Sequence, residues 1–150
     1  MAEQGDISIV AVDNAAVFIT DLFRQAFNEN PPHGPTHYVA FAKIGPARFE
    51  AVGYYHVTEC GPYGLVGGLC IDPRYRNRGL GEALSRIAFV DPGPKKALFA
   101  YLNNPVSIAI ARRIDYVHTQ HQYLMVRWFV TLPEQEQRAM IDEVAARGPF

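Results

Sequence analysis

The sequence predicts an α/β domain in which a mixed, largely antiparallel sheet is flanked by helices. Runs with strand character alternate with runs whose apolar residues recur at helical spacing, in the order β-α-β-β-β-α-β-α-β. Three consecutive strand-like runs are joined by short turns containing Gly and Pro, as in an antiparallel meander. The chain has 150 residues, which is enough for one domain with its own core.

The first part of the chain predicts a strand followed by a helix. Residues 6–12, DISIVAV, have strand character, and Asp13 or Asn14 is placed to cap the next helix. One face of that helix carries apolar residues at helical spacing: Ala15, Ile19, Leu22, Phe23, Ala26 and Phe27. The polar segment 28–37, NENPPHGPTH, then ends the helix in a loop.

The meander follows this loop. HYVAFAKI (37–44) and RFEAVGYYHVT (48–58) are joined by GPA, a connection of hairpin size. A second turn, CGPYG, leads to LVGGLCI (65–71). These segments supply the antiparallel half of the sheet.

The second half alternates helices with strands. Apolar residues at positions 80, 83, 84, 87 and 88 predict a helix packed on the sheet. It ends at DPGP (91–94), before a buried strand (96–102), a helix (105–114) and a long closing strand (122–130). We expect six to seven strands in total.

Residues 6–130 are therefore expected to form the main domain, with 131–150 as a C-terminal helical tail. Thr131 and Glu134 have the spacing of a capping box. The tail helix carries Met140, Ile141, Val144 and Ala145 on one side. That side is expected to cover a sheet edge or a partner subunit, as in a homodimer.

Composition excludes several classes of partner. The formal net charge is -1, so the chain has no overall attraction for nucleic acid or membranes. No apolar run approaches the length needed to span a bilayer, and the first residues lack a secretion signal, so a cytoplasmic location is expected. Cys60 and Cys70 are expected to be reduced thiols, without a metal or disulfide.

The most informative stretch is DPRYRNRGLGEAL, residues 72–84, where a strand gives way to a helix. The free N–H groups of a helix's first turn, together with the helix dipole, favour an anion. Gly79 and Gly81 leave the backbone open to such a ligand. Arg74, Arg76 and Arg78 add positive charge, and the sequence therefore predicts a phosphate site.

The strand before this loop contains Gly67 and Gly68, which predict a bulge or a close approach to the backbone. A bulged strand that leads into a phosphate cradle fits a ligand with an extended amide arm and a pyrophosphate, such as coenzyme A. A dinucleotide fingerprint is excluded because its third glycine position holds Leu84, and no P-loop pattern occurs.

The segment CIDPRYRNRGLGEAL resembles the acyl-CoA motif of the GNAT superfamily of N-acetyltransferases, V-x-P-x-x-R/Q-x-x-G-x-G/A followed by a leucine. The matching residues are Ile71, Pro73, Arg76, Gly79, Gly81 and Leu84. Asn104 and the pair Asp115–Tyr116 also fall at family spacings. The resemblance covers residues 6–130, with specific motifs in 64–116.

The resemblance implies that acetyl-CoA, as co-substrate, binds where two central strands splay apart. The implied cofactor-binding residues are Leu69, Cys70, Ile71, Arg76, Asn77, Arg78, Gly79, Leu80, Gly81 and Asn104. Backbone groups of 69–71 would pair with the pantetheine arm, and 76–81 would surround the pyrophosphate. Asn104 is also suited to cap the helix that begins at Pro105.

The chemistry implied by the family is direct attack of an amine on the thioester. The family's usual acid is a tyrosine, where this chain has Ala111, and its early-strand base glutamate falls near Leu65. The remaining catalytic candidates are His56, Glu59 and Tyr116, with Tyr54, His118 and His121 less well supported. The backbone N–H of Cys70 or Ile71 would stabilise the oxyanion.

The acceptor is expected to be a primary amine of a small molecule or peptide. Its pocket would be walled by segments 27–39 and 116–124, which are rich in aromatic and His residues. The alternative is a non-catalytic acyl-CoA-binding module that has lost the acid tyrosine. A structural interaction domain is a third hypothesis.

Overall fold

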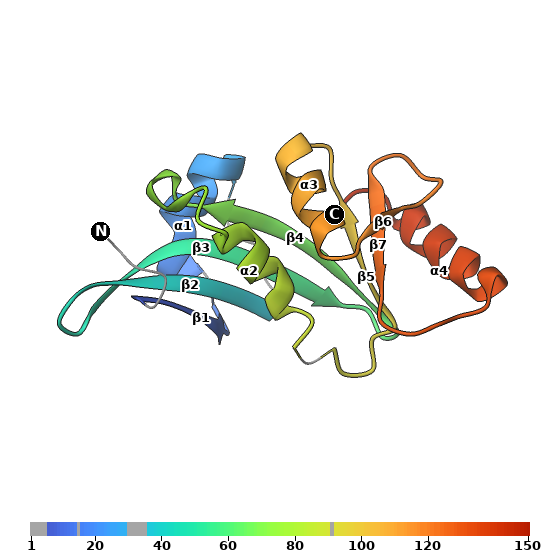
Figure 1. Ribbon diagram of the computed structural model, residues 1–150, viewed down its shortest axis with the longest axis horizontal. Helices are drawn as coiled ribbons and strands as arrows, with labels where there is room; N and C mark the ends of the chain where they lie inside the picture. Colours follow the sequence, from blue (N-terminus) through green and yellow to red (C-terminus); the bar gives the residue numbers. More distant parts are fainter. Residues whose placement is uncertain (1–5, 15, 30–35, 91) are drawn as a thin grey trace. The chain divides into compact units, whose positions relative to one another are not determined.

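The computed structural model describes residues 6–14, 16–29, 36–90 and 92–150. They form seven strands and four α-helices, with one short 3₁₀ helix (Figure 1). The strands are β1 (Ile7–Val12), β2 (Thr36–Gly45), β3 (Arg48–Glu59), β4 (Tyr63–Ile71), β5 (Ala97–Tyr101), β6 (Val117–His118) and β7 (Leu124–Trp128). The helices are α1 (Ala16–Phe27), η2 (Pro73–Tyr75), α2 (Leu80–Ile87), α3 (Pro105–Arg113) and α4 (Glu134–Arg147).

The sheet has the strand order β1-β2-β3-β4-β5-β7-β6. β1 pairs antiparallel with β2 and β2 with β3, whereas β5 runs parallel to β4. The pairing of β4 with β5 joins three residues of each strand, Tyr63–Leu65 and Ala97–Phe99, although both strands continue. This mixed α/β architecture confirms the predicted fold class.

The chain divides into two compact units. The first combines Met1–Thr58 with Gly68–Ala88, and the second combines Glu59–Gly67 with Phe89–Phe150. β4 therefore contributes residues to both units. The predicted boundary at residue 130 stays a prediction.

In the first unit, α1 and α2 cover opposite faces of the strands (Figure 1). Ile19 and Phe23 of α1 pack in a buried cluster with Val39, Tyr54 and Cys70. On the other face, a Cβ added to Gly53 would stand 2.8 Å from Cδ1 of Leu84 in α2. Because successive strand residues point to opposite faces, Gly53 packs against α2 and the neighbouring Tyr54 packs against α1.

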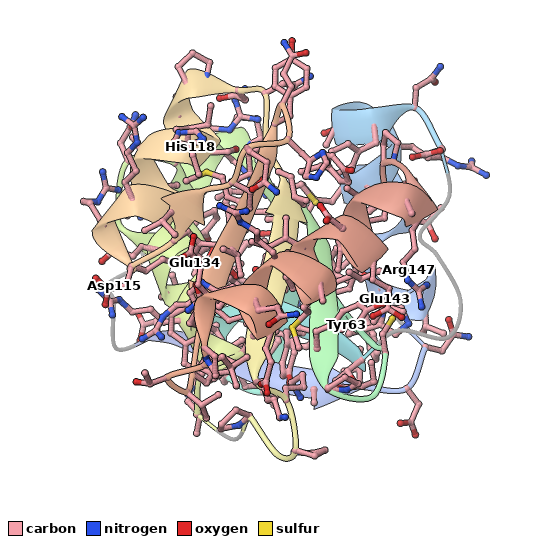
Figure 2. The ribbon with its side chains drawn as sticks, turned by 90° about the vertical axis from the view of Figure 1, so that its right-hand side faces the viewer. Tyr63, Asp115, His118, Glu134, Glu143 and Arg147 are labelled. Atoms are coloured by element: carbon pink, nitrogen blue, oxygen red, sulfur yellow. The ribbon has the colours of Figure 1, made fainter. Side chains whose placement is uncertain are left out.

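In the second unit, α4 packs on a face formed by β4, β5 and β7. Ile141 and Val144 belong to one buried cluster with residues of these strands: Tyr63, Leu65, Ala97, Phe99, Leu124 and Val126. Nε of Arg147 donates a hydrogen bond of 2.9 Å to the Tyr63 hydroxyl (Figure 2). The apolar side of the tail helix is confirmed, but it covers this face rather than a sheet edge or a partner subunit.

The structure corrects two predicted elements. The closing strand of 122–130 is shorter, because Tyr123 has φ 68 and β7 spans Leu124–Trp128, while β6 is an additional short strand. The predicted cap at Thr131 is wrong, since Pro133 is the N-cap of α4 and, among the described residues, no side chain caps that helix. The expected strand 96–102 and helix 105–114 are confirmed within a residue.

Parts of three predictions lie outside the described residues. These are Ala15 of the first helix, residues 30–35 of the expected acceptor wall, and Asp91 of the DPGP turn. None of the described helices combines the length and apolar character needed to cross a bilayer.

Candidate functional site

The N-terminus of α2 forms an open cradle of backbone groups. Asn77 and Gly79 both have left-handed backbones, with φ 63 and φ 77. Gly79 is the N-cap of α2, and in the described part of the chain no side chain caps that helix. The first intrahelical bond is donated by Ala83 to the Gly79 carbonyl at 3.0 Å, so the N–H groups of the preceding first turn have no helical acceptor.

The space in front of this cradle is open. A Cβ added to Gly79 would meet no atom of the described residues within 4 Å. Gly81, the second residue of the helix, is also incompletely buried. The helix dipole places partial positive charge at the same point, and these features fit an anion such as a pyrophosphate.

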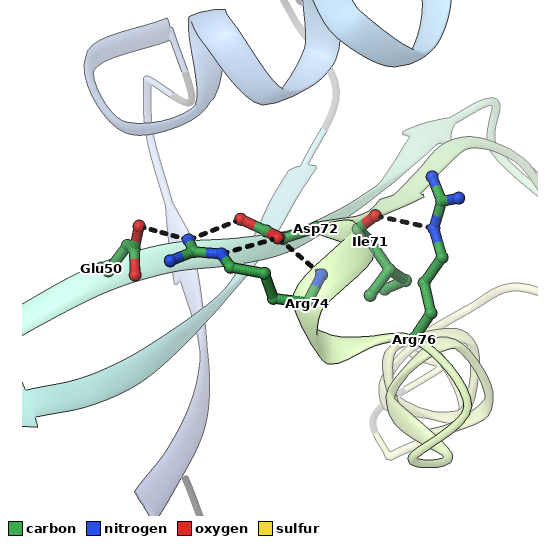
Figure 3. Close-up of polar contacts among 5 residues, drawn as sticks. All are labelled: Glu50, Ile71, Asp72, Arg74 and Arg76. Atoms are coloured by element: carbon green, nitrogen blue, oxygen red, sulfur yellow. Dashed lines mark hydrogen bonds and ion pairs between the residues drawn. The ribbon is translucent and has the colours of Figure 1, made fainter. Parts of the chain in front are cut away.

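The three arginines of the loop have different environments, and Figure 3 shows those of Arg74 and Arg76. Arg74 is held by two carboxylates: its Nη2 lies 2.6 Å from Oε1 of Glu50 and 2.8 Å from Oδ2 of Asp72. The hydrogen bonds from Arg74 lower the pKa of Asp72. Arg74 is therefore neutralised within the protein and adds little charge to the anion site, contrary to the sequence-based prediction.

Arg76 and Arg78, next to the cradle in the chain, make different contacts from Arg74. Nε of Arg76 donates to the Ile71 carbonyl at 3.3 Å (Figure 3). The guanidinium of Arg78 lies 5.2 Å from the centre of the Tyr75 ring, a cation–π arrangement. Both side chains are exposed, so two of the three arginines remain suited to an anionic ligand.

The N-terminus of α3, in the second unit, is satisfied by its own cap. Oδ1 of Asn104 accepts hydrogen bonds from the N–H groups of Val106 at 2.8 Å and Ser107 at 3.4 Å. The capping role expected for Asn104 is confirmed. Its cofactor role stays a prediction, and the amide nitrogen is the part of this side chain left for it.

The β4 residues before the cradle point their side chains to both faces of the sheet in the first unit. The Cys70 thiol is buried in the α1 cluster, and burial raises its pKa to about 12 against an opposing effect of Arg76. The Ile71 side chain points toward α2, because its Cδ1 lies 3.1 Å from a Cβ placed on Gly53. Leu69 is half-buried. Their predicted pairing with a pantetheine arm would use backbone groups.

A second polar cluster occupies the α1 face, around a bend in β4. Gly68 has φ 69, and a Cβ there would stand 3.0 Å from Cε2 of Tyr54 and 3.1 Å from Nδ1 of His56. The Tyr54 hydroxyl is 2.6 Å from Nδ1 of His37, which is buried. Burial, with a smaller contribution from Cys70, raises the pKa of Tyr54.

His56 lies in this cluster and differs from an ordinary surface histidine. Burial and then the neighbouring His37 lower its pKa to about 4. The imidazole is therefore neutral at physiological pH and is a weaker base than a free histidine.

The other two catalytic candidates belong to the second unit and have separate partners. Glu59 forms an ion pair with Lys95, with Nζ 2.9 Å from Oε2, and the Lys95 side chain is only 8% exposed. Tyr116 is buried, with its ring 6.3 Å from that of Phe89. Glu59 is thus engaged with a lysine, and the roles proposed for it and for Tyr116 stay predictions.

The less supported histidines are paired on the surface of the second unit. Nε2 of His118 is 3.0 Å from Nη2 of Arg112, and Nε2 of His121 is 3.0 Å from Oδ1 of Asp142. No group of three or more His, Cys, Asp or Glu side chains within the described ranges is arranged to hold a metal ion.

Comparison with known proteins supports a common fold. The structure superposes on Arabidopsis thaliana NAA60, solved with a bisubstrate analogue, with a TM-score of 0.64 at 13% identity, covering 83% of this chain and 99% of the other. The ribosomal-protein-S18-alanine N-acetyltransferase of Escherichia coli gives 0.62 at 14% identity, covering 85% and 97%. The chain has the GNAT fold.

Sequence similarity covers a smaller region. Mycothiol acetyltransferase of Salinispora tropica is 34% identical over 87 residues, which is 57% of this chain and 27% of that protein. The chain thus spans about a quarter of the length of that relative. N-acetylglutamate synthase of Neisseria gonorrhoeae, solved with coenzyme A and N-acetyl-glutamate, gives a TM-score of 0.64 at 15% identity, covering 86% and 36%. No family model matches the chain.

A further backbone feature lies at the pair Asp115–Tyr116, which the resemblance singled out by its spacing. Asp115 has φ 74. This left-handed conformation favours glycine, although aspartate tolerates it better than most residues. Ala111, at the position of the family's acid tyrosine, is buried.

Sequence reasoning missed His37, Glu50 and Lys95. Each is a partner of a residue that the sequence singled out, but 17 to 36 positions away. His37 lies opposite His56 in the β2–β3 register, which is known only once the two strands are paired. None of the three residues has a local sequence signal.

Proposed function

We propose that this GNAT-fold protein is an N-acetyltransferase that moves an acetyl group from acetyl-CoA to a primary amine of a small molecule or peptide. The observation that supports the proposal is the N-terminus of α2, which no described side chain caps and before which Asn77 and Gly79 have left-handed backbones. The solved neighbours that have this fold include the ribosomal-protein-S18-alanine N-acetyltransferase of Escherichia coli.

In this proposal the chain's backbone does most of the cofactor binding. The N–H groups of Leu80 and Gly81 donate to the diphosphate, with Arg76 and Arg78 beside it. Acetyl-CoA supplies an activated acetyl group as a thioester. Backbone groups of Leu69–Ile71 hold its extended arm, and an N–H of this strand stabilises the developing oxyanion.

The chemistry requires an unprotonated amine and a thiol leaving group. An alkyl ammonium loses its proton near pH 10.4, so the amine needs a base or a desolvated pocket. With Ala111 at the acid position, a water molecule or another hydroxyl has to protonate the leaving thiolate. A thiol with a pKa near ~8.5 needs less help to leave than an alkoxide does.

Two observations favour the second candidate, a non-catalytic acyl-CoA-binding module. Ala111 cannot donate a proton, and Glu59 is held by the enclosed Lys95. In such a module, occupancy by acyl-CoA would regulate a protein partner. The two candidates share the cofactor site and differ in whether the thioester reacts.

The cofactor site can be tested by calorimetric titration with acetyl-CoA. The Gly81→Glu variant places a carboxylate at the cradle and is expected to abolish binding by steric clash and repulsion. Gln135→Glu, in the exposed first turn of α4, adds the same charge elsewhere and is the matched control. Retained affinity in the Gly81 variant would exclude the proposed cradle.

Thiol release over a panel of amines and peptides then separates the two candidates. An acetyltransferase releases free coenzyme A in an amine-dependent manner. A binding module retains intact acetyl-CoA with every acceptor, and that result together with tight binding would favour the module.

A further inference from the structure

Nδ1 of His56 is a buried polar atom with no hydrogen-bond partner in the part of the chain that the structure describes. Most buried polar groups in proteins are hydrogen-bonded, so such an atom requires an explanation. A neutral imidazole carries one N–H and one lone pair, and either can occupy Nδ1. The surroundings of this nitrogen decide between them.

Gly68 lies directly against Nδ1. A Cβ on Gly68 would stand 3.1 Å from Nδ1 and 3.2 Å from Cε1 of His56. The glycine hydrogen that takes the place of a Cβ therefore points at this nitrogen. If Nδ1 carries the lone pair, the C–H group of Gly68 can donate a weak hydrogen bond to it. If Nδ1 carries the proton, its N–H would face the glycine hydrogen and would have no acceptor.

The neighbouring polar groups leave Nδ1 without an acceptor. The Tyr54 hydroxyl is engaged with His37 at 2.6 Å, and the Tyr54 and His56 ring centres are 5.8 Å apart. Cys70 of β4 is a neutral, buried thiol, and α1 adds the apolar Ile19 and Phe23 to the cluster. A proton at Nδ1 would thus be both buried and unsatisfied.

We propose that His56 is a neutral imidazole with its proton on Nε2, and that it donates this proton in a hydrogen bond to a substrate oxygen instead of removing a proton from the acceptor amine. The proposal rests on the proposed acetyltransferase function and assigns a role to one of its candidate residues.

Burial and His37 both oppose the imidazolium, and the pKa of His56 is lowered to about 4. Above that pH the ring has a single lone pair, and Gly68 covers it at Nδ1. A base must offer a lone pair to the ligand, which this ring cannot do from Nε2. The ligand atom is then a carbonyl or carboxylate oxygen, and the amine proton leaves to another group, such as solvent water.

The tautomer can be measured directly by ¹⁵N NMR of the imidazole nitrogens between pH 5 and 8. The His56 signals are assigned by their loss in His56→Gln. We expect an unprotonated Nδ1 and a protonated Nε2 throughout this range. A proton on Nδ1, or titration of the ring near pH 6.5, would overturn the proposal. This readout needs no activity, so it stays separate from a failure of the wild-type protein to bind or use acetyl-CoA.

A pair of substitutions tests the donor role in thiol release. The Gln amide can place an N–H near the position of Nε2 but cannot accept a proton at neutral pH, and Leu can do neither. His56→Gln is expected to keep the rate within about threefold of wild type, and His56→Leu to lose about 100-fold, the effect of removing one oxyanion donor. Equal losses in both variants, with acetyl-CoA affinity and circular dichroism unchanged, would identify a base and refute the donor role.

Discussion

Replacing Gly68 with Ala tests the close approach between β4 and the His56–Tyr54 pair. The new methyl group would stand 3.0 Å from Cε2 of Tyr54 and 3.1 Å from Nδ1 of His56, well inside the ~3.5–4.0 Å optimum for such atoms. The Tyr54 ring is fully buried and cannot swing away. Overpacking of this kind costs about 1–3 kcal/mol.

The backbone adds a second contribution at Gly68. Its φ of 69 is left-handed, and a residue with a Cβ is disfavoured there by about 1–2 kcal/mol. Alanine also lowers the conformational entropy of the unfolded chain, which offsets about 0.4–1 kcal/mol of this destabilisation. The free energy of unfolding should therefore fall by about 2–4 kcal/mol, or the Tm by about 6–12 °C for a chain of this size.

Gly79→Ala is the matched control. Gly79 has φ 77 in the same unit, but a Cβ added there would have no atom of the described part of the chain within 4 Å. The free energy of unfolding of this variant should fall by about 1 kcal/mol, because only the backbone conformation opposes the alanine. Urea unfolding followed by circular dichroism measures both variants. If the two variants lose the same stability, the methyl group meets no obstacle at Gly68, and the described packing of His56 is incorrect.

Three further predictions concern stability. Asn104→Ala should cost about 1 kcal/mol in thermal unfolding because the N–H groups capped by Asn104 lose their acceptor, and an unchanged Tm would show that the cap contributes nothing. The folded pKa of His56, about 4, is below the unfolded value of 6.5, so the unfolded chain binds the proton first as pH falls. Urea titrations should therefore show that the free energy of unfolding drops by about 2–3 kcal/mol between pH 6.5 and 4.5. The drop should be smaller in His56→Gln, and parallel curves for the two proteins would contradict the prediction. Glu59→Gln should cost about 1–2 kcal/mol by leaving the enclosed Lys95 ammonium without its carboxylate, and Lys95→Met should cost less; the reverse order in urea unfolding would exclude a stabilising pair.

The sequence predicted the elements that depend on local chain properties. The strands of the meander follow from the strand character of their segments and from the Gly/Pro turns between them, and α2 follows from its apolar spacing. The cradle was predictable because strand end, Gly79 and helix start are consecutive in the chain. Its uncapped N-terminus follows from glycine having no side chain to donate or accept.

The residues that alter the chemistry were not predictable, because they depend on strand register. The Glu50–Arg74 pair joins positions 24 apart, and it removes one of the three arginines from the anion site. Burial of His56 depends on Gly68, on a different strand. The loop before β7 depends on the left-handed backbone of Tyr123, which few residues of that type adopt.

The opposite size requirements at Gly53 and Tyr54 limit which sequence changes β3 can accept during evolution. One face needs the absence of a side chain so that Leu84 can approach, and the other needs a large ring against α1. A single-residue insertion or deletion upstream in the strand would exchange these faces, placing the ring against α2 and an empty position against α1. Homologous chains should therefore vary in this strand by substitution, with length changes confined to the turns at either end.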